Sequence, residues 1–188
     1  MEKKRRINRK MKLFMGIVPP EEYKEKIRTF QRQWSDNRLP DRIEPHITVK
    51  APFDPPKTNR WLEQIQQVCQ NTPSFSLSLG APSFFGERVV HLSVKSEGLD
   101  LLHQEVIRVF TEATGFGVSY SEGKTYTPHL TLGNIRHGLT EIQIKEIGKQ
   151  ATHELAPFPS FQVDFLRVYE KKDRNTPWTV MIDLSLQK

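Results

Sequence analysis

Two segments, Pro45-His46-Ile47-Thr48-Val49 and Pro128-His129-Leu130-Thr131-Leu132, share one pattern: proline, histidine, aliphatic, threonine, aliphatic. Their histidines are 83 residues apart. Alternate side chains of a β-strand point to the same face, so each histidine shares a face with the threonine two positions later. The aliphatic side chains then point into a core. The repeat therefore predicts two similar lobes that bring two His/Thr pairs to one cleft.

The residue types of the repeat favour phosphoryl transfer. In-line displacement at phosphorus needs a base beside the attacking oxygen and an acid beside the leaving oxygen. Histidine performs either task near neutral pH, and threonine hydroxyls can donate to the non-bridging oxygens. We therefore predict that His46 and His129 are catalytic and that Thr48 and Thr131 bind the substrate phosphate.

The sequence lacks the usual signatures of a metal site. It contains no His-Glu-x-x-His motif, no paired cysteines and no acidic triplet. We expect no metal and no other cofactor.

Hydrophobic periodicity places strands and helices around the two segments. Strands are expected at residues 12–18, 44–50, 75–79, 88–94 and 128–133. Apolar residues recur at helical spacing after Pro20, from near residue 58, after Ser96 and after Thr140. Gly115 is expected as the C′ residue of the helix after Ser96, and Thr140 and Gln143 are expected to form a capping box at the start of the last helix. Two runs of alternating apolar and polar residues close the chain, and we expect them to form a β-hairpin. One face of the first run carries Phe161, Val163 and Phe165, and one face of the second carries Trp178, Val180, Ile182, Leu184 and Leu186. Because no Pro- or Ser-rich linker divides the chain, this order predicts an α+β fold of two similar lobes in a single domain, residues 11–188.

Composition limits the class of protein. The 188 residues are 36% hydrophobic and 27% charged, unlike membrane or disordered chains. The longest apolar run, residues 13–18, is too short to span a bilayer. Cys69 is the only cysteine, so we expect a reducing, cytoplasmic setting, with Cys69 in the core.

The positive charge is concentrated at the N-terminus. Residues 1–10 contribute +5 of the net charge of +6. We expect a solvated, disordered leader, because blocks of like charge are usually disordered. The alternative is an arm that makes a weak contact with nucleic acid.

Other residues near the repeat are candidates for accessory roles. Lys50 is expected on the same face as His46 and Thr48, where it would neutralise a phosphate; the alternative is a solvated lysine at a strand end. His91, in a third His-x-Ser sequence, is expected to line the cleft or be exposed, with direct chemistry as the less favoured alternative.

Tyr126 precedes the second segment and would stack on a base, or be a half-buried loop aromatic. We expect the other histidines, His103, His137 and His153, at the surface or in loops.

The paired His-x-Thr segments resemble those of the 2H phosphoesterase superfamily, which includes the 2′-5′ RNA ligase-like proteins. The run Pro45-His46-Ile47-Thr48-Val49-Lys50-Ala51-Pro52-Phe53 is especially similar to the YjcG-like bacterial branch. The resemblance implies two βαβ-like lobes related by a pseudo-twofold axis, with antiparallel sheets around a central cleft and helices outside. It also implies metal-independent action on 2′,3′-cyclic phosphates or 2′-5′ linkages. Many relatives carry a basic residue directly after the second segment, where this chain has Gly133-Asn134; the nearest arginine is Arg136.

Two hypotheses of function follow. The first is a metal-independent phosphoesterase acting on a cyclic phosphate or phosphodiester of a nucleotide or RNA end. The second is a non-catalytic module that binds RNA ends or phosphorylated small molecules, which predicts salt-dependent affinity without turnover. No membrane contact and no protein partner is predicted.

Overall fold

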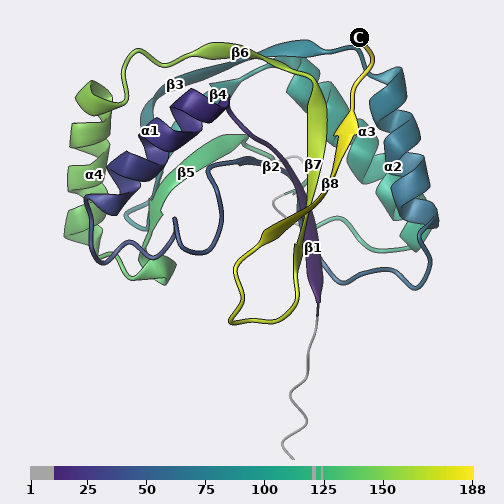
Figure 1. The fold of residues 1–188 in the computed structure, drawn as a ribbon, viewed down its shortest axis with the longest axis horizontal. Coiled ribbons are helices and arrows are strands. Elements are labelled where there is room, and N and C mark those ends of the chain that lie inside the picture. Colours follow the sequence, from purple (N-terminus) through teal and green to yellow (C-terminus); the bar gives the residue numbers. More distant parts are fainter. Residues whose placement is uncertain (1–10, 120–121, 124) are drawn as a thin grey trace, which may run out of the picture.

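Within the part of the chain that the structure describes, eight strands form one antiparallel sheet in the order β6-β3-β4-β5-β2-β1-β7-β8 (Figure 1). The computed structural model describes residues 11–119, 122–123 and 125–188. The strands are β1 (Lys12–Ile17), β2 (Ile47–Phe53), β3 (Phe75–Phe85), β4 (Val89–Lys95), β5 (His129–Asn134), β6 (Ser160–Val163), β7 (Phe165–Lys171) and β8 (Thr179–Ser185). The helices are α1 (Glu21–Arg32), α2 (Arg60–Asn71), α3 (Glu97–Thr114) and α4 (Glu141–Glu154), with a short 3₁₀ helix η2 (Ile135–His137). The basic segment 1–10, for which a leader or a nucleic-acid arm was expected, lies outside the described residues.

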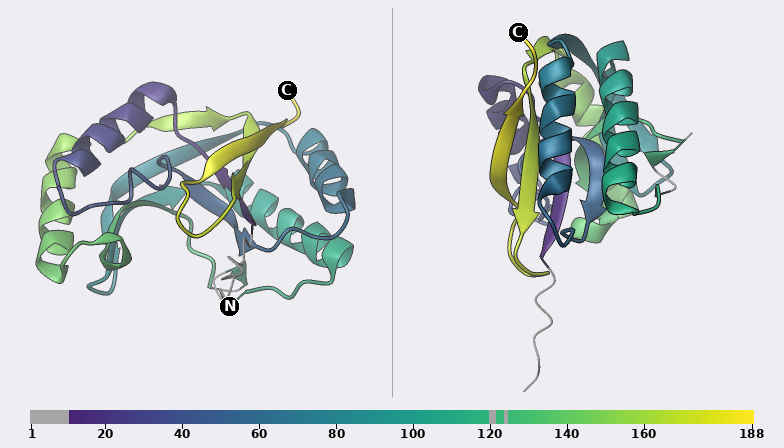
Figure 2. Two further views of the ribbon diagram at one scale, coloured as in Figure 1. Left: turned by 60° about the horizontal axis from the view of Figure 1, so that its bottom comes forward. Right: turned by 90° about the vertical axis from the view of Figure 1, so that its right-hand side faces the viewer.

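The strand order is symmetric about the junction of β5 and β2. One half of the sheet is β6-β3-β4-β5 and the other is β2-β1-β7-β8. Helices α1 and α4 lie beside the first half, and α2 and α3 beside the second (Figures 1 and 2). Helix α1 follows β1 yet contacts β5, whereas α3 follows β4 yet contacts β2, so each half receives a helix from the other. The α+β, bilobal architecture is confirmed, with the two halves joined edge to edge in one curled sheet.

The core lies between the sheet and the helices. Ile47, Val49, Leu130 and Leu132 are at most 1% exposed and pack in one cluster with the apolar stripes of the helices. Each such side chain contributes about 1.5–3 kcal/mol on burial. The aliphatic positions of the repeat therefore hold its strands against the helices, and the alternation leaves the His/Thr face turned away from this core.

The helix signals predicted at Ser96, at Gly115 and at Thr140 with Gln143 are confirmed. The Ser96 side chain accepts a hydrogen bond from the Leu99 amide at 3.2 Å, and Gly115 ends α3 with φ of 70°. Thr140 and Gln143 form the capping box of α4. These signals depend on neighbours within a few residues, which is why the sequence alone reveals them.

The closing strands differ from expectation. The first run breaks at Asp164: β6 pairs with β3 at one edge of the sheet, whereas β7 pairs with β1 and β8. Val180 and Ile182 are 47% and 39% exposed, whereas Leu184 and Leu186, expected on the same face, are 3% and 4% exposed. Strand β8 is an edge strand, and a register shift in its pairing with β7 interrupts the expected alternation.

None of the described helices is long and apolar enough to cross a membrane.

Candidate functional site

The two His-x-Thr segments lie side by side at the centre of the sheet. Ile47 of β2 pairs with Leu130 of β5 in antiparallel register. The same register places Thr48 opposite His129 and Thr131 opposite His46, so each histidine faces the threonine of the other copy. The histidines are then diagonal neighbours on one face, roughly 7–8 Å apart at Cα by the usual spacing of such pairs. The predicted convergence of these four residues is present in the fold.

Both imidazoles are oriented by the same local hydrogen bond. His46 Nδ1 lies 2.8 Å from the carbonyl oxygen of Glu44, and His129 Nδ1 lies 2.8 Å from that of Thr127. Because a carbonyl only accepts, Nδ1 carries the hydrogen in each ring. Each Nε2 is then left as the atom that can take or give a proton, and neither bonds to a described residue.

Burial sets the protonation state of these rings. Desolvation lowers the pKa of His46, as does the positive charge of His129, against the opposing hydrogen bond to Glu44. Desolvation likewise lowers the pKa of His129. Both imidazoles are therefore predominantly neutral at neutral pH in the unliganded protein, and an anion between them would favour protonation of one.

The His/Thr face opens into a cleft with two compartments. The first compartment, of about 560 Å³, contains His46, Thr48 and Thr131; its other lining residues are Phe14, Leu39, Arg42, Ile43, Pro52, Asn134, His137, Lys171, Arg174 and Trp178. The second compartment, of about 450 Å³, contains His129 and Thr48; its other lining residues are Val49, Ala51, Pro52, Phe85, Glu122, Thr125, Tyr126 and Thr127. Thr48 and Pro52 border both compartments, so a ligand at the His/Thr face has access to each.

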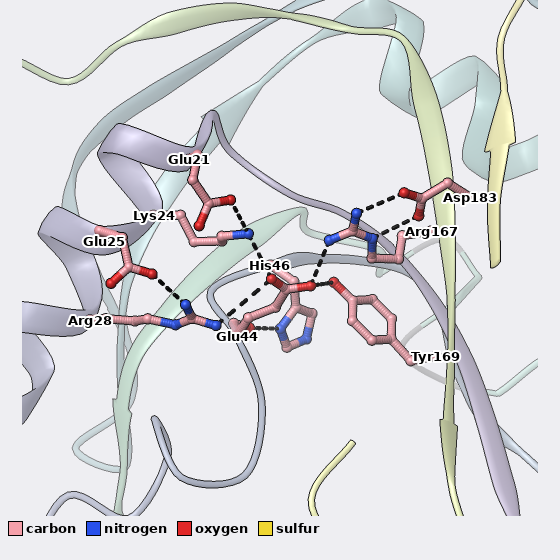
Figure 3. A network of polar contacts seen from close by, with 9 residues as sticks. All are labelled: Glu21, Lys24, Glu25, Arg28, Glu44, His46, Arg167, Tyr169 and Asp183. Atoms are coloured by element: carbon pink, nitrogen blue, oxygen red, sulfur yellow. Dashed lines mark hydrogen bonds and ion pairs between the residues drawn. The ribbon is translucent and has the colours of Figure 1, made fainter. Parts of the chain in front are cut away.

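A buried carboxylate fixes the segment before His46 (Figure 3). Glu44 accepts hydrogen bonds from Lys24 Nζ, Arg167 Nη1 and Tyr169 Oη, each at 2.8 Å. Burial raises the pKa of Glu44, but these hydrogen bonds outweigh it and lower the pKa to about 2. The carboxylate thus joins α1 to β7, while the Glu44 carbonyl orients His46. Sequence reasoning missed this hub, because its partners come from two segments, α1 and β7, that are far from Glu44 in the sequence.

The second copy has aromatic support. The Phe85 ring stacks on His91 at 4.2 Å between centroids and lies edge-on to His129 at 4.8 Å. His91 pairs with Thr131 across β4 and β5, and its ring is 5.2 Å from that of His129. It is 3% exposed, and its Nε2 is buried without a hydrogen-bond partner among the described residues. The expectation that His91 lines the cleft or is exposed is therefore wrong: its ring is buried against Phe85 and His129 and lines neither compartment.

The position of Lys50 differs from the prediction that it shares a face with His46 and Thr48. A β-bulge in the pairing of β1 with β2 places Lys50 opposite Met15, which is fully buried, so the side chain leaves the face of His46 and Thr48. Its ammonium lies 2.7 Å from Glu122 Oε1 and 4.9 Å from the centroid of Phe110, a core ring. Both alternatives for Lys50, a cleft lysine and a solvated one, are wrong: it forms a buried ion pair.

Tyr126 and His103 belong to the same structural support. Tyr126 borders the second compartment, but its ring stacks on His103 at 3.5 Å and its hydroxyl donates to the Thr48 carbonyl at 2.9 Å. One face of the Tyr126 ring is thus covered by His103, and only the other face is left to stack on a base. His103, expected near the surface, is 3% exposed and bonds through Nδ1 to the Val49 carbonyl at 2.7 Å. These contacts tie the Thr48 and Val49 carbonyls of β2 to Tyr126 and His103.

Arg136 lies on η2, exposed and outside both compartments, whereas its neighbours Asn134 and His137 line the first. The cations that line this compartment come from elsewhere: Arg42 from the loop after α1, Lys171 from the end of β7 and Arg174 from the β7–β8 turn. Sequence reasoning missed them; the cluster of cations in the turn was the available signal.

Within residues 11–119, 122–123 and 125–188, no group of three or more His, Cys, Asp or Glu side chains is placed to hold a metal ion.

Comparisons with known proteins agree with this architecture. The family model described as the 2′-5′ RNA ligase superfamily matches residues 18–175. Similar solved structures include TT0787 of Thermus thermophilus, with TM-score 0.67 and 17% identity over 94% of this chain and 98% of that chain. They also include E. coli LigT complexed with NADP+, with TM-score 0.64 and 19% identity over 96% and 100%. A further structure, a phosphoesterase, has TM-score 0.62 and 18% identity over 95% and 99%.

No curated protein sequence matches the chain. At these identities the solved structures show a shared fold. The family match carries more weight, because it spans most of the chain and includes both His-x-Thr segments and the loops around the cleft. This chain therefore belongs to the 2′-5′ RNA ligase superfamily.

Proposed function

We propose that this protein is a phosphoesterase that opens a cyclic phosphate, or cleaves a phosphodiester, at a nucleotide or RNA end. The observation that carries the proposal is the pair of imidazoles at one cleft, each with Nδ1 tied to a carbonyl and Nε2 left to exchange a proton. Membership of the superfamily supports a phosphoesterase- or ligase-type activity. Structures of E. coli LigT, which has the same fold, were solved with phosphate, 3′-AMP, ATP and NADP+, and this supports a phosphorylated nucleotide as ligand.

The proposed reaction uses both copies of the repeat. One histidine takes a proton from water as the water oxygen attacks phosphorus, and the other gives a proton to the ribose oxygen as its bond to phosphorus breaks. Thr48 and Thr131 donate hydrogen bonds to the non-bridging oxygens, where negative charge develops. The register that sets each histidine opposite a threonine supports this division of roles. His46 and His129 exchange the roles of acid and base between the forward and reverse directions.

The experiment is turnover of 2′,3′-cyclic nucleotides and short RNAs ending in a cyclic phosphate, with and without a chelator. We expect His46→Ala and His129→Ala each to lower kcat/KM by roughly 10²–10⁴-fold. His153→Ala, which removes an exposed histidine of α4, is the matched control and should leave the rate unchanged. Activity that survives both site variants, or that disappears with the chelator, would contradict the mechanism.

Two finer assignments remain part of the proposal. The run 45–53 supports the YjcG-like branch of the superfamily. The single cysteine, Cys69, is buried and burial raises its pKa to about 12, which suits a reducing cytoplasmic setting.

A further inference from the structure

The far wall of the first compartment is cationic. Arg42, Lys171 and Arg174 line it together with His137, and none of the described residues that line the compartment carries a carboxylate. These groups come from the loop after α1, the end of β7, the β7–β8 turn and η2. None of the three permanent cations forms an ion pair with a described residue. A wall of this kind, inside a cleft rather than on an open face, is suited to an anion.

Main-chain contacts build this wall. Arg42 Nη1 donates to the Asn175 carbonyl at 2.7 Å, and the Trp178 amide donates to the Arg42 carbonyl at 2.8 Å. The Arg38 amide donates to the His137 carbonyl at 2.9 Å. These hydrogen bonds hold together three segments that are far apart in the sequence, and they thereby bring the cations of these segments to one wall of the compartment.

The cations repel one another in the absence of a ligand. Burial lowers the pKa of His137, and the charges of Arg42, Arg38, Lys171 and Arg136 lower it further. Burial and then Arg42 lower the pKa of Lys171.

Asp173 is the acidic group that opposes this effect at Lys171. Its Oδ1 is engaged in its own turn, where it accepts from the amides of Asn175 at 2.8 Å and Thr176 at 3.1 Å. A bound anion would relieve the remaining repulsion.

Two aromatic rings connect His46 to this wall along the floor of the compartment. The His46 ring is 5.0 Å from Phe14, the Phe14 ring is 4.7 Å from Trp178, and Lys171 Nζ is 5.7 Å from the Trp178 ring. Along this path, Phe14 and Trp178 lie between the His46 ring and the Lys171 ammonium. A ligand that binds both groups along the path extends across these two rings.

Building on the proposed function, we propose that the substrate carries a second phosphate, besides the reacting one, that binds Arg42, Lys171 and Arg174. The substrate class is then a nucleotide or oligonucleotide end with an additional phosphate, and a nucleoside cyclic phosphate without one is a poor substrate. The first compartment holds the extra phosphate at its far wall while the reacting phosphate lies between the two histidines.

The test compares three cyclic phosphates: adenosine 2′,3′-cyclic phosphate, its 5′-phosphorylated form, and a dinucleotide ending in a 2′,3′-cyclic phosphate. We expect kcat/KM to be about 10-fold or more higher when the second phosphate is present, as charged hydrogen bonds usually give. A preference for the 5′-phosphorylated form indicates a mononucleotide substrate, and a preference for the dinucleotide indicates an oligonucleotide end. The double variant Lys171→Gln/Arg174→Gln should lose the preference, and Lys172→Gln, an exposed neighbour outside the compartment, should keep it.

Binding to the wild-type protein separates this inference from the proposed activity. Calorimetry with adenosine 2′-phosphate and adenosine 2′,5′-bisphosphate should show about 10-fold tighter binding of the bisphosphate, lost in the double variant. That result without turnover of any cyclic phosphate supports the second-phosphate site and rejects the phosphoesterase proposal. Equal affinities, or a preference that the double variant retains, overturn the second-phosphate site even where turnover is observed.

Discussion

Replacing Glu44 with Gln tests whether the buried carboxylate holds the site together. The substitution keeps the size of the side chain but removes its charge, while Lys24 and Arg167 stay in place with side chains 7% and 16% exposed. Both cations lose the partner that joins α1 to β7 (Figure 3). A cation left without its buried partner destabilises the fold.

The magnitude follows from the pKa of Glu44. Its fall from 4.5 to about 2 in the folded protein corresponds to about 3 kcal/mol of stability at pH 7. The Glu44 side chain is 11% exposed, so solvent screens little of its attraction to the neighbouring cations. Because the folded pKa lies below the unfolded one, the stabilisation is present above pH 4.5 and is lost as the pH falls to about 2.

Urea unfolding of the wild type and Glu44→Gln between pH 7 and pH 3 measures this contribution. We expect the variant to be about 3 kcal/mol less stable at pH 7, with the difference about halved by pH 3. Glu21→Gln is the matched control: it removes the other carboxylate on Lys24, but that side chain is 71% exposed and should cost at most about 1 kcal/mol. Equal stability of Glu44→Gln and wild type at pH 7, or a difference independent of pH, would refute the reasoning.

Three further outcomes are expected. Lys50→Met should destabilise the fold by about 3–5 kcal/mol in urea unfolding, because it leaves Glu122 buried without its cation. Adding Glu122→Gln should recover part of the lost stability, and no recovery would contradict the ion pair. Gly16→Ala should lower both stability and activity, because its Cβ would lie 2.9 Å from the Ile47 carbonyl oxygen beneath the first segment, whereas Gly117→Ala, with open space around it, should be neutral in the same assays. The pH profile of kcat/KM should be bell-shaped, because raising the pH deprotonates the catalytic acid and lowering the pH protonates the catalytic base. Its optimum should lie below about pH 6.5, because burial lowers the pKa of both His46 and His129. An optimum above about pH 7 would contradict this assignment.

The pairing of distant segments explains why some expectations were wrong. Alternation predicted that Lys50 follows Thr48 onto the cleft face, but a bulge depends on how many residues the partner strand supplies, and β1 supplies fewer than β2 at that point. The run 160–171 reads as one strand because nothing in its own residues reveals that β6 pairs at one edge and β7 near the other.

The sequence by itself determined the local features of this protein. It placed the strands and helices, gave the caps at Ser96 and Thr140, and set histidine and threonine on one face of each repeated segment, because these features depend on backbone geometry within a few residues. Only the tertiary structure decided that β2 and β5 are neighbours, that Glu44 gathers partners from α1 and β7, and that cations from separate loops meet at the far wall of the first compartment. Those decisions rest on long-range burial and strand pairing, which bring together residues that no local pattern connects.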